Sequence, residues 1–123
     1  MGAEDLHGAV EKAVNNRDVD ALVALYEADA CMLGPAGEQS VGLDAIRATW
    51  EELLAFDGSL AMTTLSAVEA GDIAYLANRW EMSIDGAVVA SAVTAEVARQ
   101  QSDGAWKYVI DNPYAAEVSI PEA

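Results

Sequence analysis

The chain has 123 residues, of which 53% are hydrophobic, and 21 acidic against 6 basic side chains give it a formal net charge of −15. This length predicts one domain over residues 1–123 that buries roughly two-thirds of the surface of the unfolded chain, and the apolar content argues against intrinsic disorder. Because the few basic residues are scattered, the composition argues against nucleic acid and anionic membranes as partners.

Single copies of cysteine and histidine limit the chemistry further. Cys31 has no second cysteine for an intramolecular disulfide, and Cys31 and His7 are too few for a structural metal site. We therefore expect no metal and no cofactor. The first residues are acidic where a secretory signal would be basic, and no apolar run approaches the roughly 20 residues that span a bilayer, so we expect a cytoplasmic protein.

Helical patterns fill most of the first half of the chain. Residues 4–16 place apolar side chains at helical spacing, which predicts an amphipathic helix. Asp18 is a suitable N-cap for a second helix, whose end we place at residues 27–29. A short strand over residues 30–33 leads into a glycine and proline turn, and a third helix follows Gly42 and continues to Phe56.

The second half of the chain changes to the period of a strand. From Leu60 onward, four strands are predicted, separated by turn signals at residues 70–72, 85–86 and 102–104. Successive strands with short turns form an antiparallel meander. Three helices followed by a long, curved antiparallel sheet place the chain in the α+β class.

Three segments in this order carry a resemblance to a known family: AVNNRDVDALVALY (residues 13–26), GLDAIR (residues 42–47) and DGAWKYVID (residues 103–111). With them the chain resembles, over nearly its whole length, the SnoaL-like, ketosteroid isomerase-like branch of the nuclear transport factor 2-like superfamily. The resemblance implies a cone-shaped, cystatin-like roll in which the sheet wraps around the helices and leaves an apolar pocket. Relatives include ketosteroid isomerases, polyketide cyclases, epoxide hydrolase-like enzymes and binding proteins without activity, so the fold does not fix the function.

Strand alternation selects the side chains that we expect to face this pocket. On the strand that follows residue 72, the inward set contains Asn78, Trp80 and Met82. On the next strand we expect Val97 to face inward, with Val93 and Ala95, and Glu96 to face outward, with Thr94. The candidate ligand-binding residues are Trp50, Leu54, Asn78, Trp80, Met82 and Val97.

Asp111 on the last strand is the candidate catalytic residue. A carboxyl in apolar surroundings has its charged form disfavoured, and this raises its pKa towards the range that suits general acid or base catalysis. The alternative is that Asp111, shortly before Pro113, only bonds backbone where the strand bends. His7 is a further candidate for the pocket mouth, although a lone histidine near a helix start is more often structural.

Comparison with the relatives bears on which reaction is available. The resemblance places Gly34 at the position of the catalytic carboxylate of ketosteroid isomerases, and Val10 at or beside the position of their oxyanion tyrosine. Isomerisation by that machinery is therefore not expected, because the base and the hydrogen-bond donor are both missing. Asp111 resembles the last-strand aspartate of the epoxide hydrolase-like relatives. Arg79 and Glu81 have the spacing of their partner residues, but they face outward unless the strand register is shifted by one.

The outer face of the sheet is a candidate dimer interface. Outward side chains here are expected to be Tyr75, Arg79, Glu81, Glu96 and Tyr108. In relatives this face builds a homodimer, and a solvated face is the alternative.

The predicted function is binding of an apolar or polycyclic metabolite by a homodimer, with a cofactor-independent cyclase, isomerase or epoxide-opening reaction of secondary metabolism as one hypothesis. A non-catalytic carrier and a dimerisation accessory module are the alternatives.

Overall fold

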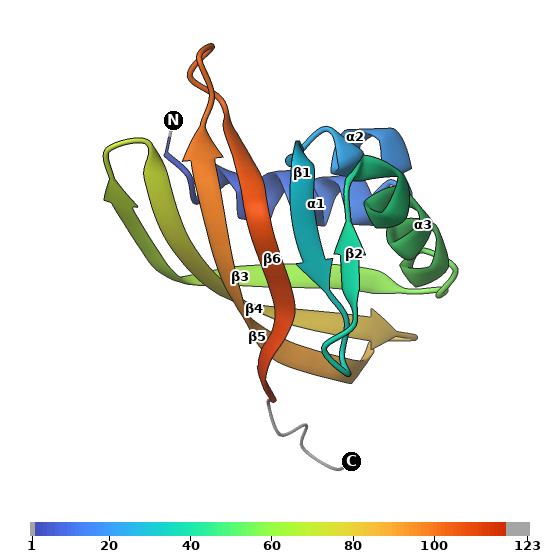
Figure 1. Cartoon of the computed structure of the whole chain (residues 1–123). Helices are drawn as coiled ribbons and strands as arrows, with labels where there is room; N and C mark the ends of the chain where they lie inside the picture. Colours follow the sequence, from blue (N-terminus) through green and yellow to red (C-terminus); the bar gives the residue numbers. More distant parts are fainter. Residues whose placement is uncertain (1, 118–123) are drawn as a thin grey trace.

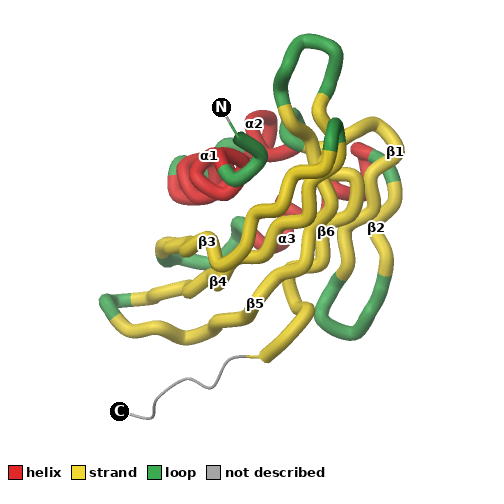
Figure 2. The backbone as a smooth tube through the Cα atoms, turned by 90° about the vertical axis from the view of Figure 1, so that its left-hand side faces the viewer, coloured by secondary structure: helices red, strands yellow, loops and turns green. Residues whose placement is uncertain are grey.

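A computed structural model describes residues 2–117, and in it a curved six-stranded sheet wraps around the helices, which lie on its concave side (Figure 1, Figure 2). The α+β class is as predicted, although two strands lie between the second and third helices. The elements in chain order are α1 (Asp5–Asn15), α2 (Val19–Val23), β1 (Tyr26–Leu33), β2 (Gln39–Val41), α3 (Leu43–Leu53), β3 (Ser59–Ala70), β4 (Ile73–Ile84), β5 (Ala87–Gln100) and β6 (Trp106–Glu117).

The helices follow the sequence pattern, except at the end of the second one. The Asp18 carboxylate accepts a hydrogen bond from the backbone N–H of Ala21 and caps α2, as predicted. α2 ends at Val23, and the segment expected to continue it belongs to β1. Apolar Leu22 and Tyr26 are four residues apart, which suits a helix, but Tyr26 is buried as the first residue of a strand instead.

The sheet has the order β2-β1-β6-β5-β4-β3. Strands β3 to β6 form the predicted antiparallel meander. The expectation of an entirely antiparallel sheet is wrong, because β1 pairs with β6 in parallel and makes the sheet mixed. The short strand β2, antiparallel to β1, was not predicted, since three residues are too few to show a period.

Pairing register corrects the expected faces of β5. Glu96 lies opposite Leu76, which is fully buried, and directly opposed residues share a face. Thr94 and Glu96 therefore face inward and are buried, while Val97, opposite the exposed Tyr75, faces outward. Alternation alone assigned the apolar set to the interior, but here the outer face is also apolar.

A bulge in β6 corrects a second assignment. Ala98 pairs with Tyr108 and Val97 with Ile110, so Val109 is an extra residue. An extra residue resets the alternation of a strand. Tyr108, expected outside, is buried, and Asp111 three residues later is buried on the same side.

The space between the helices and the concave face of the sheet holds the hydrophobic core. Its larger buried side chains are Leu6, Val10, Val14, Leu22, Tyr26, Met32, Ile46, Trp50, Leu76, Trp106 and Tyr108. Within residues 2–117, no helix combines the length and the apolar character needed to cross a membrane.

Candidate functional site

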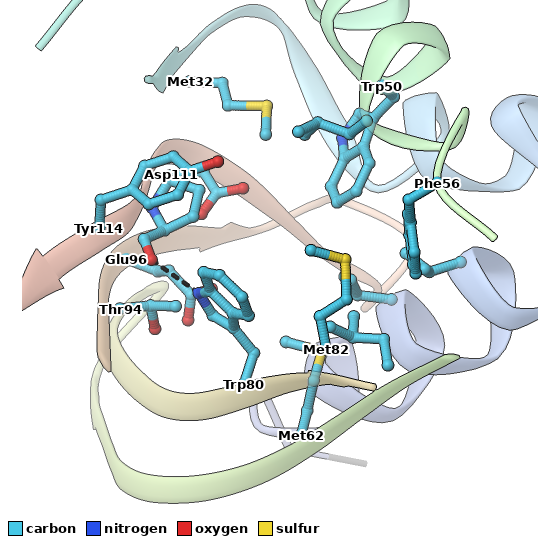
Figure 3. Close-up of a pocket in the computed structure, with 15 residues that line it drawn as sticks. Met32, Trp50, Phe56, Met62, Trp80, Met82, Thr94, Glu96, Asp111 and Tyr114 are labelled. Atoms are coloured by element: carbon cyan, nitrogen blue, oxygen red, sulfur yellow. Dashed lines mark hydrogen bonds between the residues drawn. The ribbon is translucent and has the colours of Figure 1, made fainter. Parts of the chain in front are cut away.

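A cavity of about 110 Å³ opens between the helices and the concave face of the sheet (Figure 3). A single ordered water needs only about 10–15 Å³ on a comparable measure, so this cavity has room for a ligand. Its walls come from α1, β1, α3, the segment after α3, and β3 to β6. The lining residues are Val10, Val14, Met32, Trp50, Leu53, Phe56, Leu60, Met62, Trp80, Met82, Thr94, Glu96, Asp111, Pro113 and Tyr114.

Aromatic and sulfur-containing side chains make up most of the apolar wall. Trp50 comes from α3, and Trp80 from β4, where its indole N–H donates to the backbone carbonyl of Pro113 over 2.7 Å. Phe56 is held in place by Arg17, whose guanidinium lies 4.8 Å from the centre of the Phe56 ring and also donates to the Phe56 carbonyl. These contacts fix Trp80 and Phe56 before any ligand enters.

Polar side chains gather on one side of this pocket. In Figure 3, Thr94, Glu96 and Asp111 lie on the side opposite Phe56. Glu96 and Asp111 are directly opposed across β5 and β6, an arrangement that brings side chains of a sheet within about 4.5–5.5 Å at Cβ. The pocket therefore joins an apolar body to a pair of carboxyl groups.

Asp111 is held by a hydrogen-bonded chain of buried groups. The Tyr26 hydroxyl donates to Asp111 Oδ2 over 2.5 Å, and the indole N–H of Trp50 donates to the Tyr26 hydroxyl oxygen over 3.2 Å. Asp111 Oδ1 accepts no hydrogen bond from residues 2–117. One carboxyl oxygen is thus fixed and the other is available.

Glu96 is held by a different set of partners. Nε2 of His7 lies 2.6 Å from Glu96 Oε1, and Nδ1 of His7 lies 2.8 Å from the Thr64 hydroxyl. The side-chain amide of Asn78 donates to Glu96 Oε2 over 3.3 Å. His7, Asn78 and Glu96 are all buried, so this network connects α1 to the sheet inside the core.

These surroundings change the protonation of Asp111. Burial is the largest cause and the negative charge of Glu96 adds to it, while the hydrogen bond from Tyr26 acts in the opposite direction, and together they raise the pKa of Asp111 from 3.8 to about 7. Burial, followed by the neighbouring Asp111, likewise raises the pKa of Tyr26 well above its ordinary value. Near neutral pH, Asp111 is therefore present in both protonated and ionised forms, while Tyr26 stays a donor.

The predicted site residues divide into two groups. Asp111, Trp50, Trp80 and Met82 line the cavity. The other three predicted residues do not line it. Leu54 follows the end of α3 and packs on the core, and its neighbour Leu53 lines the cavity instead. Asn78 lies behind Glu96, and Val97 is on the outer face of the sheet.

Arg79 and Glu81 also lie outside the cavity, so the register is the unshifted one. Within residues 2–117, no three histidine, cysteine or acidic side chains are arranged to hold a metal ion.

Three buried residues of the hydrogen-bonded networks around the cavity were not predicted in their observed places. The sequence predicts a helix at Tyr26. Ala30 and Met32 have the buried alternation of a strand, but the exposed Ala28 and a register shift between Tyr26 and Cys31 separate Tyr26 from it. Strand alternation predicts Glu96 on the outer face, because no local pattern shows that its partner His7 lies 89 residues away in the sequence. His7 itself was considered only for the pocket mouth, whereas it is buried behind Glu96.

Comparison with solved structures supports the same fold. A ketosteroid isomerase-like protein from Erwinia carotovora atroseptica is 24% identical, with a TM-score of 0.70 and coverage of 89% of this chain and 89% of that chain. An NTF2-like protein of unknown function from Pseudomonas putida is 23% identical, with a TM-score of 0.70 and coverage of 92% and 83%. A protein of unknown function with a cystatin-like fold from Nostoc punctiforme is 18% identical, with a TM-score of 0.74 and coverage of 89% and 84%.

At these identities the similarity shows a shared fold, and it does not show a shared activity. No curated protein sequence matches this chain. The sequence pattern of the SnoaL-like domain matches residues 7–112, which is most of the chain. The chain therefore belongs to the SnoaL-like domain family, as the resemblance in its sequence implied.

Proposed function

We propose that this protein binds an apolar small molecule in the cavity and that Asp111 transfers protons to and from it. One observation carries the proposal: a buried carboxyl, with one fixed and one available oxygen, lines an otherwise largely apolar pocket. A general acid or base works best when its pKa is near the operating pH. The pKa of Asp111, raised to about 7 by burial and by Glu96, meets this condition.

The neighbours of Asp111 suit such a role. The ionised carboxylate takes a proton from a carbon of the ligand at Oδ1, while Tyr26 holds Oδ2 and orients the group. The same carboxyl then returns the proton to another atom of that ligand. No proton is gained or lost overall, so the sequence of steps describes an isomerisation or an intramolecular cyclisation. The apolar walls keep water away from the reacting carbon.

An epoxide-opening reaction fits the site less well. That hypothesis needs Arg79 and Glu81 beside Asp111, and both lie outside the cavity. Non-catalytic carriage of a ligand is the main competing function, and it is an outcome of the following test.

The test uses 5-nitrobenzisoxazole, an apolar probe whose ring opens when a base removes its C3 proton. Loss of this proton breaks the N–O bond and releases a coloured phenolate. We expect turnover that rises with pH through about 7, as Asp111 ionises. The Asp111→Asn variant keeps the shape of the side chain, and its turnover should fall by ~10²–10⁴-fold, the usual contribution of a general base.

Asp29→Asn is the matched control, because it makes the same chemical change at an exposed position of β1 outside the cavity. It should keep the activity of the unmodified protein. If the probe binds but Asp111→Asn turns over as fast as the control, Asp111 is no base and the carrier function is favoured. If the probe neither binds nor reacts, the proposed function itself fails.

We also propose a homodimer through the outer face of the sheet. A row of apolar side chains crosses all six strands on this face, each opposite the next: Val68, Tyr75, Val97, Ile110, Cys31 and Val41. Four of them are well exposed: Val41 by 60%, Val68 by 57%, Tyr75 by 48% and Ile110 by 44%. A contiguous exposed apolar patch is typical of an interaction surface.

The composition of this face differs from the one expected from sequence, because Glu96 and Tyr108 are buried on the other side. Apolar contact, rather than charge pairing, is therefore the proposed source of its affinity.

A further inference from the structure

The polar groups of the cavity are unusually one-sided. Its lining includes the carboxyl groups of Asp111 and Glu96 and contains no lysine, arginine or histidine. His7 lies behind Glu96, and its two ring nitrogens already contact Glu96 and Thr64. The lining also carries the hydroxyls of Thr94 and Tyr114, so a ligand meets two carboxyl groups and no positive charge.

Such a site disfavours one large class of metabolites. A carboxylate or phosphate on a ligand would be buried beside two acidic side chains, and a buried charge without a partner is strongly disfavoured. The formal net charge of −15 extends the same repulsion to the approach of the ligand. Anionic ligands are disfavoured on both grounds.

A positive charge meets the opposite conditions. Asp111 Oδ1 is the available acceptor, because both oxygens of Glu96 already have partners. Trp50, Trp80 and Phe56 supply aromatic walls on the rest of the cavity, and aromatic faces attract cations. An ammonium group at Asp111 would therefore be compensated by a carboxylate and surrounded by aromatic rings.

We propose that the ligand of this cavity is an apolar, aromatic or polycyclic amine that places its protonated nitrogen against Asp111 Oδ1. Glu96 adds negative potential from the opposite strand, and the apolar body of the amine occupies the space towards Phe56. This inference rests on the proposed function, in that the same cavity and the same carboxyl are used. Each oxygen of a carboxylate has two lone pairs, so Oδ1 can accept from the ammonium and still face a carbon next to the nitrogen. The inference adds the chemical class of the ligand.

Binding of such an amine depends on the ionisation of Asp111. The titratable groups that face Asp111 are Glu96 on β5, Tyr26 on β1, and Tyr108 and Tyr114 on β6. The three tyrosines have raised pKa values, mainly because they are buried, and stay neutral between pH 5.5 and 8. His7 on α1 lies behind Glu96 and contacts it. Because Asp111 is the group placed against the ligand nitrogen, we expect its carboxyl to dominate the pH dependence of binding in this range, and Asp111→Asn separates its effect from that of the Glu96–His7 pair.

Three probes with the same naphthalene body and different head groups test the proposal: 2-naphthylmethylamine, 2-naphthylmethanol and 2-naphthoic acid. Calorimetry at pH 8 should give at least about tenfold tighter binding for the amine than for the alcohol, and the weakest binding for the acid. An opposite charge within a few Å favours the ionised form of a carboxyl by roughly one to three pKa units. The affinity of the amine should therefore fall at least about tenfold from pH 8 to pH 5.5, while that of the alcohol changes little.

Variants then locate the effect. Asp111→Asn should reduce the amine to the affinity of the alcohol and remove the pH dependence, whereas the exposed control Asp29→Asn should change neither. Should Asp111→Asn fail to fold, the head-group series and the pH dependence of the unmodified protein still decide the matter. Equal affinities for amine and acid, or an amine affinity that is constant with pH, would overturn the ligand class.

The two proposals fail in different ways. Turnover of 5-nitrobenzisoxazole that depends on Asp111, together with no preference for the amine, removes the ligand class and keeps the proposed function. A preference for the amine that depends on Asp111, with no turnover, keeps the ligand class and leaves a carrier of amines.

Discussion

Replacing Asp111 with asparagine should make the stability of the protein less sensitive to pH. The carboxyl is buried, and burial together with the charge of Glu96 raises its pKa from 3.8 to about 7. The folded protein therefore binds the proton of Asp111 more tightly than the unfolded chain does. This group favours folding most below pH 3.8, and that stability is lost as the pH rises to about 7.

The size of the effect follows from the pKa. At about 1.4 kcal/mol per pKa unit, a rise from 3.8 to about 7 corresponds to about 4 kcal/mol between the acid and alkaline limits. Between pH 5 and pH 8, where the fold is easier to study, about 2.5 kcal/mol of it is lost. Asparagine has no titrating proton, and its oxygen still accepts the hydrogen bond from Tyr26.

Urea denaturation of the two proteins at a series of pH values measures this difference. The free energy of unfolding of Asp111→Asn, minus that of the unmodified protein, should rise by about 2.5 kcal/mol from pH 5 to pH 8. Self-repulsion among the other acidic groups lowers the stability of both proteins and cancels in the difference. Asp29→Asn should give curves parallel to those of the unmodified protein. Parallel curves for Asp111→Asn would refute a raised pKa at this site.

Three further changes test the parts around Asp111. His7→Phe leaves the buried Glu96 with the Asn78 amide alone, so the free energy of unfolding should fall by about 3–5 kcal/mol in urea denaturation; a loss below about 1 kcal/mol would mean that the pair is unimportant for stability. Tyr26→Phe removes the hydrogen bond that lowers the pKa of Asp111, so the midpoint of the pH profile for 5-nitrobenzisoxazole should rise by up to about one pH unit; an unchanged or lower midpoint would contradict this. Tyr75→Glu places a charge in the apolar row of the outer face, and sedimentation at micromolar concentration should show a dimer become a monomer; an unmodified protein that is already monomeric would exclude the proposed interface.

Local patterns predicted most of the fold because the elements concerned are long and regular. The amphipathic α1, the helix after Gly42 and the four-strand meander from Leu60 all correspond to observed elements. The parallel pairing of β1 with β6 could not be predicted, because it joins Tyr26 to Tyr108 across most of the chain. The bulge at Val109 has no residue pattern of its own. It resets the inward and outward alternation of β6, so a face assigned on one side of Val109 is wrong on the other side.

The candidate site could be predicted where apolar residues define it. Trp80 and Met82 follow from alternation in a strand that has one polar face. Alternation failed in β5, where valine and alanine lie on the outer face and Glu96 points inward to His7. A buried hydrogen-bonded pair between distant positions contradicts the local sequence pattern, and only the folded arrangement shows that Glu96 and His7 are partners.

Direct titration of the Asp111 side chain tests the central claim. In protein labelled with ¹³C at aspartate side chains, the carboxyl resonance of Asp111 is assigned by its loss in Asp111→Asn and followed from pH 3 to pH 9. Burial beside Glu96 predicts a midpoint near 7. A midpoint near 4, the ordinary value for an exposed aspartate, would contradict a buried acid–base group in this cavity.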